Sequence, residues 1–127
     1  MVHVPAYKSS VEAVVYATRG RAFFREWKTQ RGFTAHNFIE GPSCMGRERE
    51  RWGHPAQKPE YLIERFLYRH SEEVFWVLDP FMGVGTIPVV CYRMGRNCVG
   101  IDKEEEYYNR AKRRLWEASG NIRLPLF

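Results

Sequence analysis

The sequence predicts an α/β fold built on a parallel sheet, and three observations lead to this prediction. Residues 74–79, VFWVLD, form a continuous apolar run that ends on an acidic residue, and a glycine turn follows at once. An apolar helical segment and a second short strand come next, so the order is strand, turn, helix, strand. Because the first run does not alternate with polar residues, we expect a strand covered by helices on both faces of the sheet. The length of 127 residues suits a single domain.

The N-terminal part of that domain has a different character. Residues 11–26 are expected to form a β-hairpin, because two β-favouring runs flank Arg19 and Gly20 and the glycine can supply the turn. Residues 27–53 hold many glycines and the charge run RERER at 47–51, which predicts a long loop. The βαβ pattern occupies the remainder, residues 54–127.

The helices of this third region have recognisable ends. A helix is expected from about Pro59 to His70, since proline suits the first helical position and the apolar residues repeat on one face. After the glycine turn, Thr86 can cap a second helix, and Gly95 can end it in the left-handed conformation.

A short strand from Asn97 to Ile101 then ends on Asp102. The segment KEEEYYNRAKRRLWEA, residues 103–118, predicts a last helix with acids in its first turn and bases in its last turn. The expected helix C-terminal charges are Arg110, Lys112, Arg113 and Arg114.

The glycine turn is the first candidate for a binding site, because open α/β sheets bind ligands where their parallel strands end. Gly83 and Gly85 allow positive φ angles and leave room for a ligand against the backbone. Asp102 lies 19 positions after Gly83 at the end of the next strand, where its carboxylate can accept hydrogen bonds from a ribose diol. The alternatives are an ordinary tight connection and, for Asp102, a helix cap completed by Glu105.

The turn favours a nucleoside ligand without phosphates. Where a dinucleotide site would carry a third glycine, this chain has Ile87 and Pro88, and proline also removes an N–H donor. Asp79 would repel a phosphate but can accept hydrogen bonds from an ammonium group. These features point to S-adenosylmethionine, although Asp79 could instead only hold its own loop.

The composition favours a polyanionic partner, because the net charge is +5 and the pI is about 9.3. Candidate phosphate contacts are the basic residues of the expected hairpin and loop, which are Arg19, Arg21, Arg25, Lys28, Arg47, Arg49 and Arg51. For each arginine taken alone, a solvated surface residue is the favoured interpretation, and the alternating signs of RERER weaken a DNA role.

Other sequence features bear on the compartment and on metals. The first residues lack a secretion signal, and no apolar run approaches the ~20 residues that span a bilayer, so we expect a cytoplasmic protein without a membrane partner. Cys44, Cys91 and Cys98 form no C-x-x-C pair, which predicts reduced, packed thiols and no metal site.

Three segments together resemble the DNA amino-methyltransferases that modify adenine N6 or cytosine N4. They are HPAQKP at 54–59, DPFMGVGT at 79–86 and VGIDKEEEYYNRAKRRL at 99–115, in the order of the permuted group whose cofactor half follows its catalytic half. The resemblance covers roughly residues 12–115. It implies a Rossmann-like methyltransferase sheet, incomplete here, that consists of the C-terminal cofactor half and a hairpin.

The resemblance also implies roles for individual residues. The methionine end of S-adenosylmethionine would be lined by Asp79, Phe81, Gly83, Gly85 and Thr86. Asp102 would hold the ribose, and Lys58 would support the amino-acid end or be a solvated residue. His54 is expected to be structural.

One departure from the family pattern matters for activity. Those enzymes carry Asp, Asn or Ser followed by Pro-Pro and an aromatic residue, which makes the target amine more reactive and stacks on the flipped base. None of the seven prolines here is adjacent to another, so no catalytic residue can be assigned. The chain thus resembles a cofactor half, and we expect a complementing polypeptide or a second copy to fill the gap beside the strand at 74–79.

The leading interpretation is therefore one part of a DNA methyltransferase that depends on S-adenosylmethionine. A non-catalytic remnant that binds cofactor or DNA is the alternative. An RNA methyltransferase is a third, weaker interpretation, because one cofactor fold serves many substrates.

Overall fold

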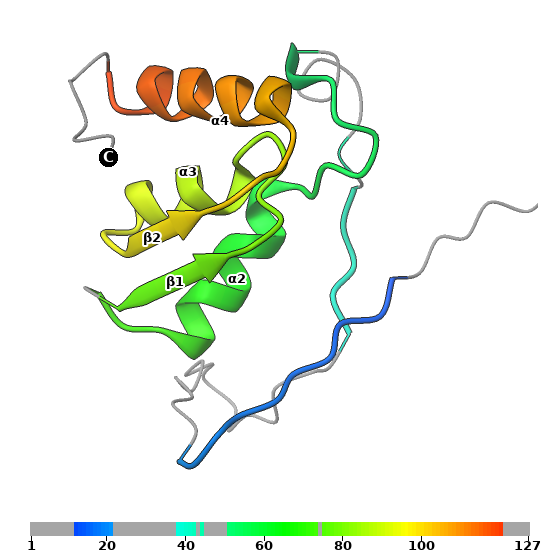
Figure 1. The fold of residues 1–127 in the computed structure, drawn as a ribbon. Helices are drawn as coiled ribbons and strands as arrows, with labels where there is room; N and C mark the ends of the chain where they lie inside the picture. The colour runs from blue at the N-terminus through cyan, green and yellow to red at the C-terminus, as the bar shows by residue number, and fades with distance from the viewer. Residues whose placement is uncertain (1–11, 22–37, 43, 45–50, 74, 121–127) are drawn as a thin grey trace, which may run out of the picture.

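The computed structural model describes residues 12–21, 38–42, 44, 51–73 and 75–120 (Figure 1). The regular elements of this part follow one another along the chain as α2 (Glu60–His70), β1 (Trp76–Asp79), α3 (Thr86–Arg93), β2 (Asn97–Gly100) and α4 (Glu105–Ala118). The predicted order of strand, glycine turn, helix and strand is confirmed.

The two strands pair in parallel, as the βαβ pattern predicts. Leu78 lies opposite Val99, and Asp79 lies opposite Gly100. Helix α3 forms the crossover between the strands. Since both strands run in the same direction, their carboxyl ends meet at one edge, and the glycine turn and Asp102 lie there together.

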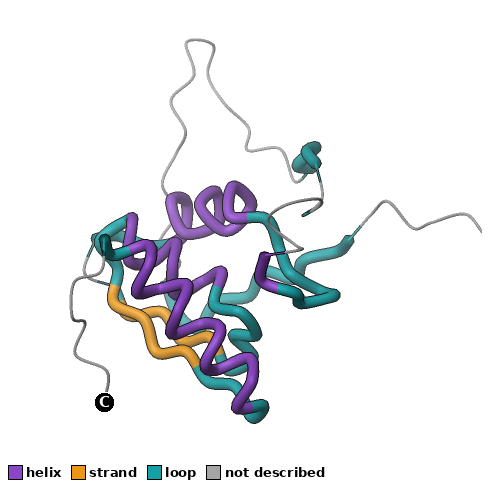
Figure 2. Tube along the Cα trace, turned by 90° about the horizontal axis from the view of Figure 1, so that it is seen from above, coloured by secondary structure: helices purple, strands orange, loops and turns teal. Residues whose placement is uncertain are grey.

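Helices α2, α3 and α4 lie on one side of the sheet, so of the helices expected on both faces the described residues provide one layer. Helix α3 contacts both strands, and α2 and α4 both pack on α3. In the view of Figure 2 the orange strands form an outer layer beside the purple helices. Among the described residues the fold is thus a two-layer α/β arrangement with α3 at its centre.

The opposite sheet face is open in the described part of the chain. Four large apolar side chains of β1, β2 and the residue after β2 are exposed, at 73% for Trp76, 64% for Leu78, 44% for Val99 and 51% for Ile101. A continuous apolar run shows that a strand can be buried on both sides, but the covering layer must come from elsewhere. No described element supplies it here.

The core is formed mainly by α3. Its residues Val89, Val90 and Cys91 are fully buried, and Val84 of the preceding turn is 2% exposed. Burying three consecutive residues requires contacts around most of the helix, which the sheet, α2 and α4 provide.

Some helix ends differ from the prediction by one or two residues. Pro59 is extended, with φ −69° and ψ 141°, and precedes the first residue of α2. The residue before α3 is Gly85 in the left-handed conformation, so Thr86 is the first residue of the helix and not its cap. Gly95 has φ +69°, as predicted for a residue that ends the helix. The last turn of α4 contains no basic residue.

Part of the predicted hairpin, residues 12–21, is described and forms a loop without a strand. Gly20 does turn the chain, with φ +80°. The loop runs beside α2, where the Tyr16 ring stacks on His70 at 4.3 Å between centroids. A strand needs a neighbour to bond its backbone, and residues 12–21 have none among the described residues. The second arm of the hairpin, and most of the predicted loop at 27–53, lie outside that part.

Candidate functional site

The turn between β1 and α3 is fixed to the end of β2 by backbone hydrogen bonds. The Met82 N–H donates to the Ile101 carbonyl at 2.9 Å, and the Ile101 N–H donates to the Asp79 carbonyl at 2.9 Å. Within the turn, the Gly85 N–H donates to the Met82 carbonyl at 2.8 Å. Gly83 and Gly85 have φ angles of +51° and +77°, which favour glycine. The positive φ angles predicted for both glycines are confirmed.

Asp102 joins the second strand to this turn. Its Oδ2 accepts from the Gly83 N–H at 2.9 Å, and its Oδ1 accepts from the Glu104 N–H at 2.9 Å. The residue before α4 is Glu104, so Asp102 is not the helix cap, although it holds the start of that helix. Each carboxylate oxygen accepts more than one hydrogen bond, so these contacts leave room for a ligand hydroxyl.

Asp79 ends β1 with a side chain that is 8% exposed. Its Oδ1 accepts from the Phe81 N–H at 3.3 Å, the contact expected if Asp79 holds its own loop. Burial raises the pKa of Asp79 above its ordinary value of 3.8, the Phe81 N–H opposes the shift, and the negative charge of Asp102 adds to it. A positively charged group near Asp79 would stabilise its ionised form.

A small cavity of about 100 Å³ opens beside the turn. Sites that enclose a whole drug-sized ligand measure roughly 300–1,000 Å³, so this one can hold only one end of such a molecule. The residues of the site prediction that line it are Lys58, Asp79, Phe81, Gly83 and Thr86. The structure thus brings five of the seven predicted residues together, while Gly85 and Asp102 lie outside the lining.

Gly85 has a packing role instead. A Cβ atom at this position would lie 2.8 Å from the Ala111 Cβ and 3.1 Å from its Cα. Close approach of α4 to the start of α3 therefore requires glycine here. The third glycine of a dinucleotide-binding motif, which allows close packing of a helix, is absent from this chain. Here Gly85 allows the close contact between α3 and α4.

His54 forms one wall of the cavity, and its contacts are those of a structural residue. Its Nδ1 accepts from the Ala56 N–H at 3.1 Å, and its ring meets Tyr107 edge-on at 4.6 Å. A Cβ on Gly83 would lie 3.3 Å from the imidazole. The ring thus packs directly over the turn.

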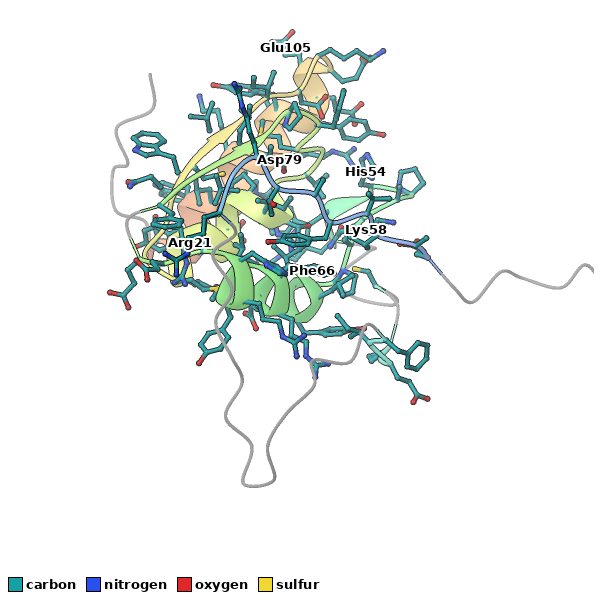
Figure 3. The ribbon with its side chains drawn as sticks, turned by 90° about the horizontal axis from the view of Figure 1, so that it is seen from below. Arg21, His54, Lys58, Phe66, Asp79 and Glu105 are labelled. Carbon is teal, nitrogen blue, oxygen red and sulfur yellow. The ribbon has the colours of Figure 1, made fainter. Side chains whose placement is uncertain are left out.

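Lys58 reaches a partner that sequence reasoning did not consider. Its Nζ lies 2.6 Å from Glu12 Oε2, and both side chains are largely exposed. Figure 3 shows Lys58 and His54 on the same side of the molecule and Arg21 on the opposite side. An exposed ion pair of this kind contributes little to stability, so Lys58 can exchange Glu12 for another anion at low cost.

Thr86 belongs to a buried polar network that the sequence did not reveal. Arg114 of α4 is 3% exposed, and its Nη1 donates to Thr86 Oγ1 at 3.1 Å. Its Nη2 donates to Glu60 Oε1 at 2.8 Å, and Glu60 also pairs with Arg93. The expectation that Arg114 is a helix C-terminal charge is wrong, because Arg114 is buried and lies before the last turn of α4. Its guanidinium instead connects the first residues of α2 and α3.

The candidate DNA contacts are only partly described. Arg19 and Arg21 are exposed, whereas Arg25, Lys28, Arg47 and Arg49 lie outside the described residues. Arg51 pairs with Glu117 and lies over the Trp52 ring at 5.1 Å.

None of the three cysteines, Cys44, Cys91 and Cys98, is joined in a disulfide. Cys91 and Cys98 share a hydrogen bond, which lowers the pKa of Cys91 and raises that of Cys98. The described residues contain no group of three His, Cys, Asp or Glu side chains that would suit a metal ion. None of the helices described has the length and apolarity needed to cross a membrane.

The chemistry of the lining fits the amino-acid end of S-adenosylmethionine. Asp79 and Thr86 both line the cavity, and their side chains carry an acceptor for an ammonium group and a hydroxyl group, respectively. The neighbouring Asp102 carboxylate lies at the end of the adjacent strand, in the place a ribose acceptor would take.

The comparisons with known proteins all indicate the same family. The profile of the DNA methylase family of the N6/N4 type matches residues 5–113. The Type II methyltransferase M2.LlaDCHI of Lactococcus lactis subsp. cremoris is 48% identical over 73 residues, which are 56% of this chain and 27% of that protein. The Type II methyltransferase M.HpaI of Haemophilus parainfluenzae is 40% identical over 93 residues, which are 73% of this chain and 30% of that protein.

A solved structure extends the similarity to the fold. The crystal structure of the M1.HpyAVI–SAM complex superposes with a TM-score of 0.62 and 36% sequence identity. The match covers 75% of this chain and 44% of that one. The chain spans less than a third of the length of the two curated relatives.

Proposed function

Because the chain belongs to the N6/N4 DNA methylase family, we propose that it is the S-adenosylmethionine-binding part of a DNA methyltransferase that acts on adenine N6 or cytosine N4. The observation that carries this proposal is the hydrogen bond from the Gly83 N–H to Asp102, which places the glycine turn, Asp79 and the second acidic residue around one edge of the sheet. The M1.HpyAVI–SAM complex, with the same fold, supports the choice of cofactor.

Each of the predicted site residues contributes differently to cofactor binding. Asp79 accepts hydrogen bonds from the ammonium group, and Thr86, with Lys58 nearby, contacts the carboxylate. Gly83 lets the ligand approach the backbone, Phe81 covers it from the solvent side, and Asp102 accepts from the ribose. Gly85 acts indirectly, by allowing α4 to approach the start of α3.

S-adenosylmethionine supplies a methyl group carried on a positively charged sulfur. The protein residues contribute by holding this group in a fixed position, because direct transfer to an amine depends on alignment of the two reacting atoms. The cavity of about 100 Å³ receives one end of the cofactor only. The remainder lies outside that cavity, towards Asp102.

The activating motif of Asp, Asn or Ser followed by Pro-Pro and an aromatic residue does not occur in this chain. Transfer therefore requires a catalytic half outside these 127 residues that carries the motif, because a second copy of the same sequence can fill the open sheet but lacks the motif as well. Two features of the sheet support this requirement. The apolar face formed by Trp76, Leu78, Val99 and Ile101 is open, and β1 pairs with β2 alone within the described residues.

The free edge of β1 also carries hydrogen-bonding groups. The Phe75 carbonyl accepts from Asn97, the first residue of β2, and the Asp79 carbonyl accepts from Ile101, which follows β2. The alternate residues Trp76 and Leu78 therefore direct their backbone groups to the other edge. A partner strand that pairs there would continue the sheet and satisfy these groups.

DNA is the proposed substrate of the assembled enzyme. Arg19 and Arg21, together with the basic residues outside the described part, would contact phosphates and so position the duplex without reading its sequence. Three cysteines without a disulfide agree with a reducing compartment, and we place the protein in the cytoplasm.

Calorimetry with S-adenosylmethionine tests the binding step in the full chain. We expect saturable binding to the wild-type protein and a loss of roughly tenfold or more in Asp102→Ala, the cost of one hydrogen bond to a charged group. Wild-type protein that binds no cofactor would rule out the proposal. Transfer of labelled methyl groups to DNA, measured with and without a chain that carries the Pro-Pro motif, tests the requirement for a partner.

One alternative has an observation in its favour. The absence of the activating motif equally fits a non-catalytic protein that binds cofactor or DNA. It predicts cofactor binding without methyl transfer, even when a catalytic half is present.

A further inference from the structure

We infer that Arg114 is a positioning residue that makes the Thr86 hydroxyl a hydrogen-bond donor towards the cavity. This inference rests on the proposed binding of S-adenosylmethionine and assigns a role to a residue outside the glycine motif. It predicts which way round the amino-acid end of the cofactor binds.

The starting point is the hydrogen bond between the two side chains. Arg114 Nη1 lies 3.1 Å from Thr86 Oγ1, and both residues are buried, with 3% and 6% exposure. A guanidinium group has only donors, so the hydroxyl oxygen must accept in this contact. One lone pair of Thr86 is thereby occupied by a charged donor.

The Thr86 O–H proton remains to be placed. A hydroxyl group has one donor and two acceptor sites, and the Arg114 contact uses an acceptor site. Among the described residues, the Thr86 hydroxyl has no protein acceptor. Because Thr86 lines the cavity beside the glycine turn, a ligand in that cavity can take this proton in a hydrogen bond.

Arg114 itself is held in place by several contacts. Glu60 Oε1 accepts from its Nη2 at 2.8 Å, and the guanidinium lies over the Trp52 ring at 5.5 Å. A planar group fixed on two sides cannot rotate away from Thr86 without losing these contacts. The orientation of the hydroxyl is therefore set before any ligand arrives.

The cavity then presents opposite polarities from two residues. Thr86 donates a hydrogen bond, and the Asp79 carboxylate accepts one. The zwitterionic end of an α-amino acid matches this pair in one orientation, with its carboxylate at Thr86 and its ammonium at Asp79. Arg114 pairs with Glu60 and does not line the cavity, so its contact with a ligand there runs through the Thr86 hydroxyl.

A double-mutant cycle tests the inference in the full chain. Binding of S-adenosylhomocysteine, which keeps the amino-acid end, is measured by calorimetry for the wild type, Arg114→Met, Thr86→Val and the double variant. We expect each single variant to lose about tenfold in affinity, and Arg114→Met to cost less than about twofold in a chain that already carries Thr86→Val. Losses that simply multiply in the double variant would overturn the inference.

A second ligand separates positioning from general loosening of the fold. 5′-Methylthioadenosine lacks the amino-acid end, so its affinity should stay within about twofold in all four proteins. Thr86→Ser, which keeps the hydroxyl, should bind S-adenosylhomocysteine nearly as the wild type does. If both ligands weaken equally in Arg114→Met, the residue is only structural.

Two further results of the experiment have a defined consequence. If Arg114→Met fails to fold by circular dichroism, Arg114→Lys replaces it in the same cycle, because it keeps a positive charge on a shorter group without the planar fork. If the wild-type chain binds neither ligand, the proposed cofactor function fails and this inference fails with it. Wild-type binding combined with independent losses overturns the inference alone.

Discussion

Asp102 accepts a hydrogen bond from the Gly83 backbone N–H at 2.9 Å, across 19 positions of sequence. The contact joins the end of β2 to the turn after β1, and the second oxygen of the same carboxylate holds the Glu104 N–H. One side chain thus fixes the shape of the turn and the start of α4. Any ligand contact made by Asp102 depends on a group that also stabilises the fold.

Replacing Asp102 with alanine should lower both the stability and the affinity for S-adenosylmethionine. Two backbone N–H groups lose a charged acceptor, and we expect unfolding to become easier by about 2 kcal/mol in urea titrations. Glu105→Ala removes an exposed carboxylate from the first turn of α4 and should change neither quantity appreciably. A destabilised Asp102 variant with undiminished cofactor affinity would restrict this residue to a structural role.

Alanine at position 85 should be far more damaging than alanine at position 95. Both glycines have similar positive φ angles, +77° and +69°, so the backbone strain is alike. Only Gly85 faces a neighbour, because its added Cβ would lie 2.8 Å from Ala111, while nothing lies within 4 Å at Gly95. We expect a cost of about 1–2 kcal/mol for Gly95→Ala from strain alone.

Gly85→Ala should cost a further ~1–3 kcal/mol, because α4 must move away from α3. Chemical denaturation of the two variants side by side measures the difference. Equal losses would mean that the contact between the start of α3 and Ala111 is not tight in solution.

The affinity for S-adenosylmethionine should fall on acidification because of Asp79. Burial raises the pKa of this carboxyl above 3.8, and its ionised form is the one that attracts an ammonium group. Binding should therefore weaken as the pH falls through the raised pKa, at a pH above that of an ordinary aspartate. Calorimetry across the acidic range should show this dependence in the wild type and lose it in Asp79→Asn.

The raised pKa of Asp79 has the opposite effect on folding stability, which it increases at low pH. Because the folded protein holds the Asp79 proton more tightly than the unfolded chain, this group stabilises the fold at low pH. That contribution is lost as the pH rises from 3.8 through the raised pKa. Asp79→Asn should remove this component from the pH dependence of urea denaturation, and an unchanged profile would show that the carboxyl is not perturbed.

The open sheet face should drive association of the isolated chain. Leu78 is 64% exposed, so Leu78→Ser should change folding stability by no more than ~0.5 kcal/mol. It should nevertheless shift sedimentation-velocity profiles towards smaller species, since it removes apolar area from the exposed face. Tyr92→Ser, at an exposed position of α3, is the matched control. A wild-type chain that sediments as a monomer at high concentration would remove the reason to expect a partner on this face.

Local sequence signals predicted the turn well because they depend on backbone geometry. Only glycine occupies the positive φ angles at positions 83, 85 and 95 easily, so its pattern marks the turn and the end of α3. The alternation of strands and helices likewise fixed the parallel pairing of β1 and β2. The position of Asp102 opposite the turn followed from the same pattern.

Tertiary contacts were harder to predict. Arg114 lies among three other basic residues and looks solvated in sequence, but its partner Glu60 is 54 positions away. Leu78 belongs to an apolar run, which indicates that the strand can be buried on both faces but does not indicate which layer covers each face. Lys58 and Glu12 likewise meet across 46 positions.

The two backbone bonds between the turn and Ile101 have a consequence for motion at the site. The Met82 amide donates to the Ile101 carbonyl, and the Ile101 amide donates to the Asp79 carbonyl. The turn is thus part of the sheet and cannot open as a separate flap. In hydrogen–deuterium exchange, the Met82 and Ile101 amides should therefore be protected to the same extent. A ligand then enters by movement of side chains, while the backbone of the turn keeps its position.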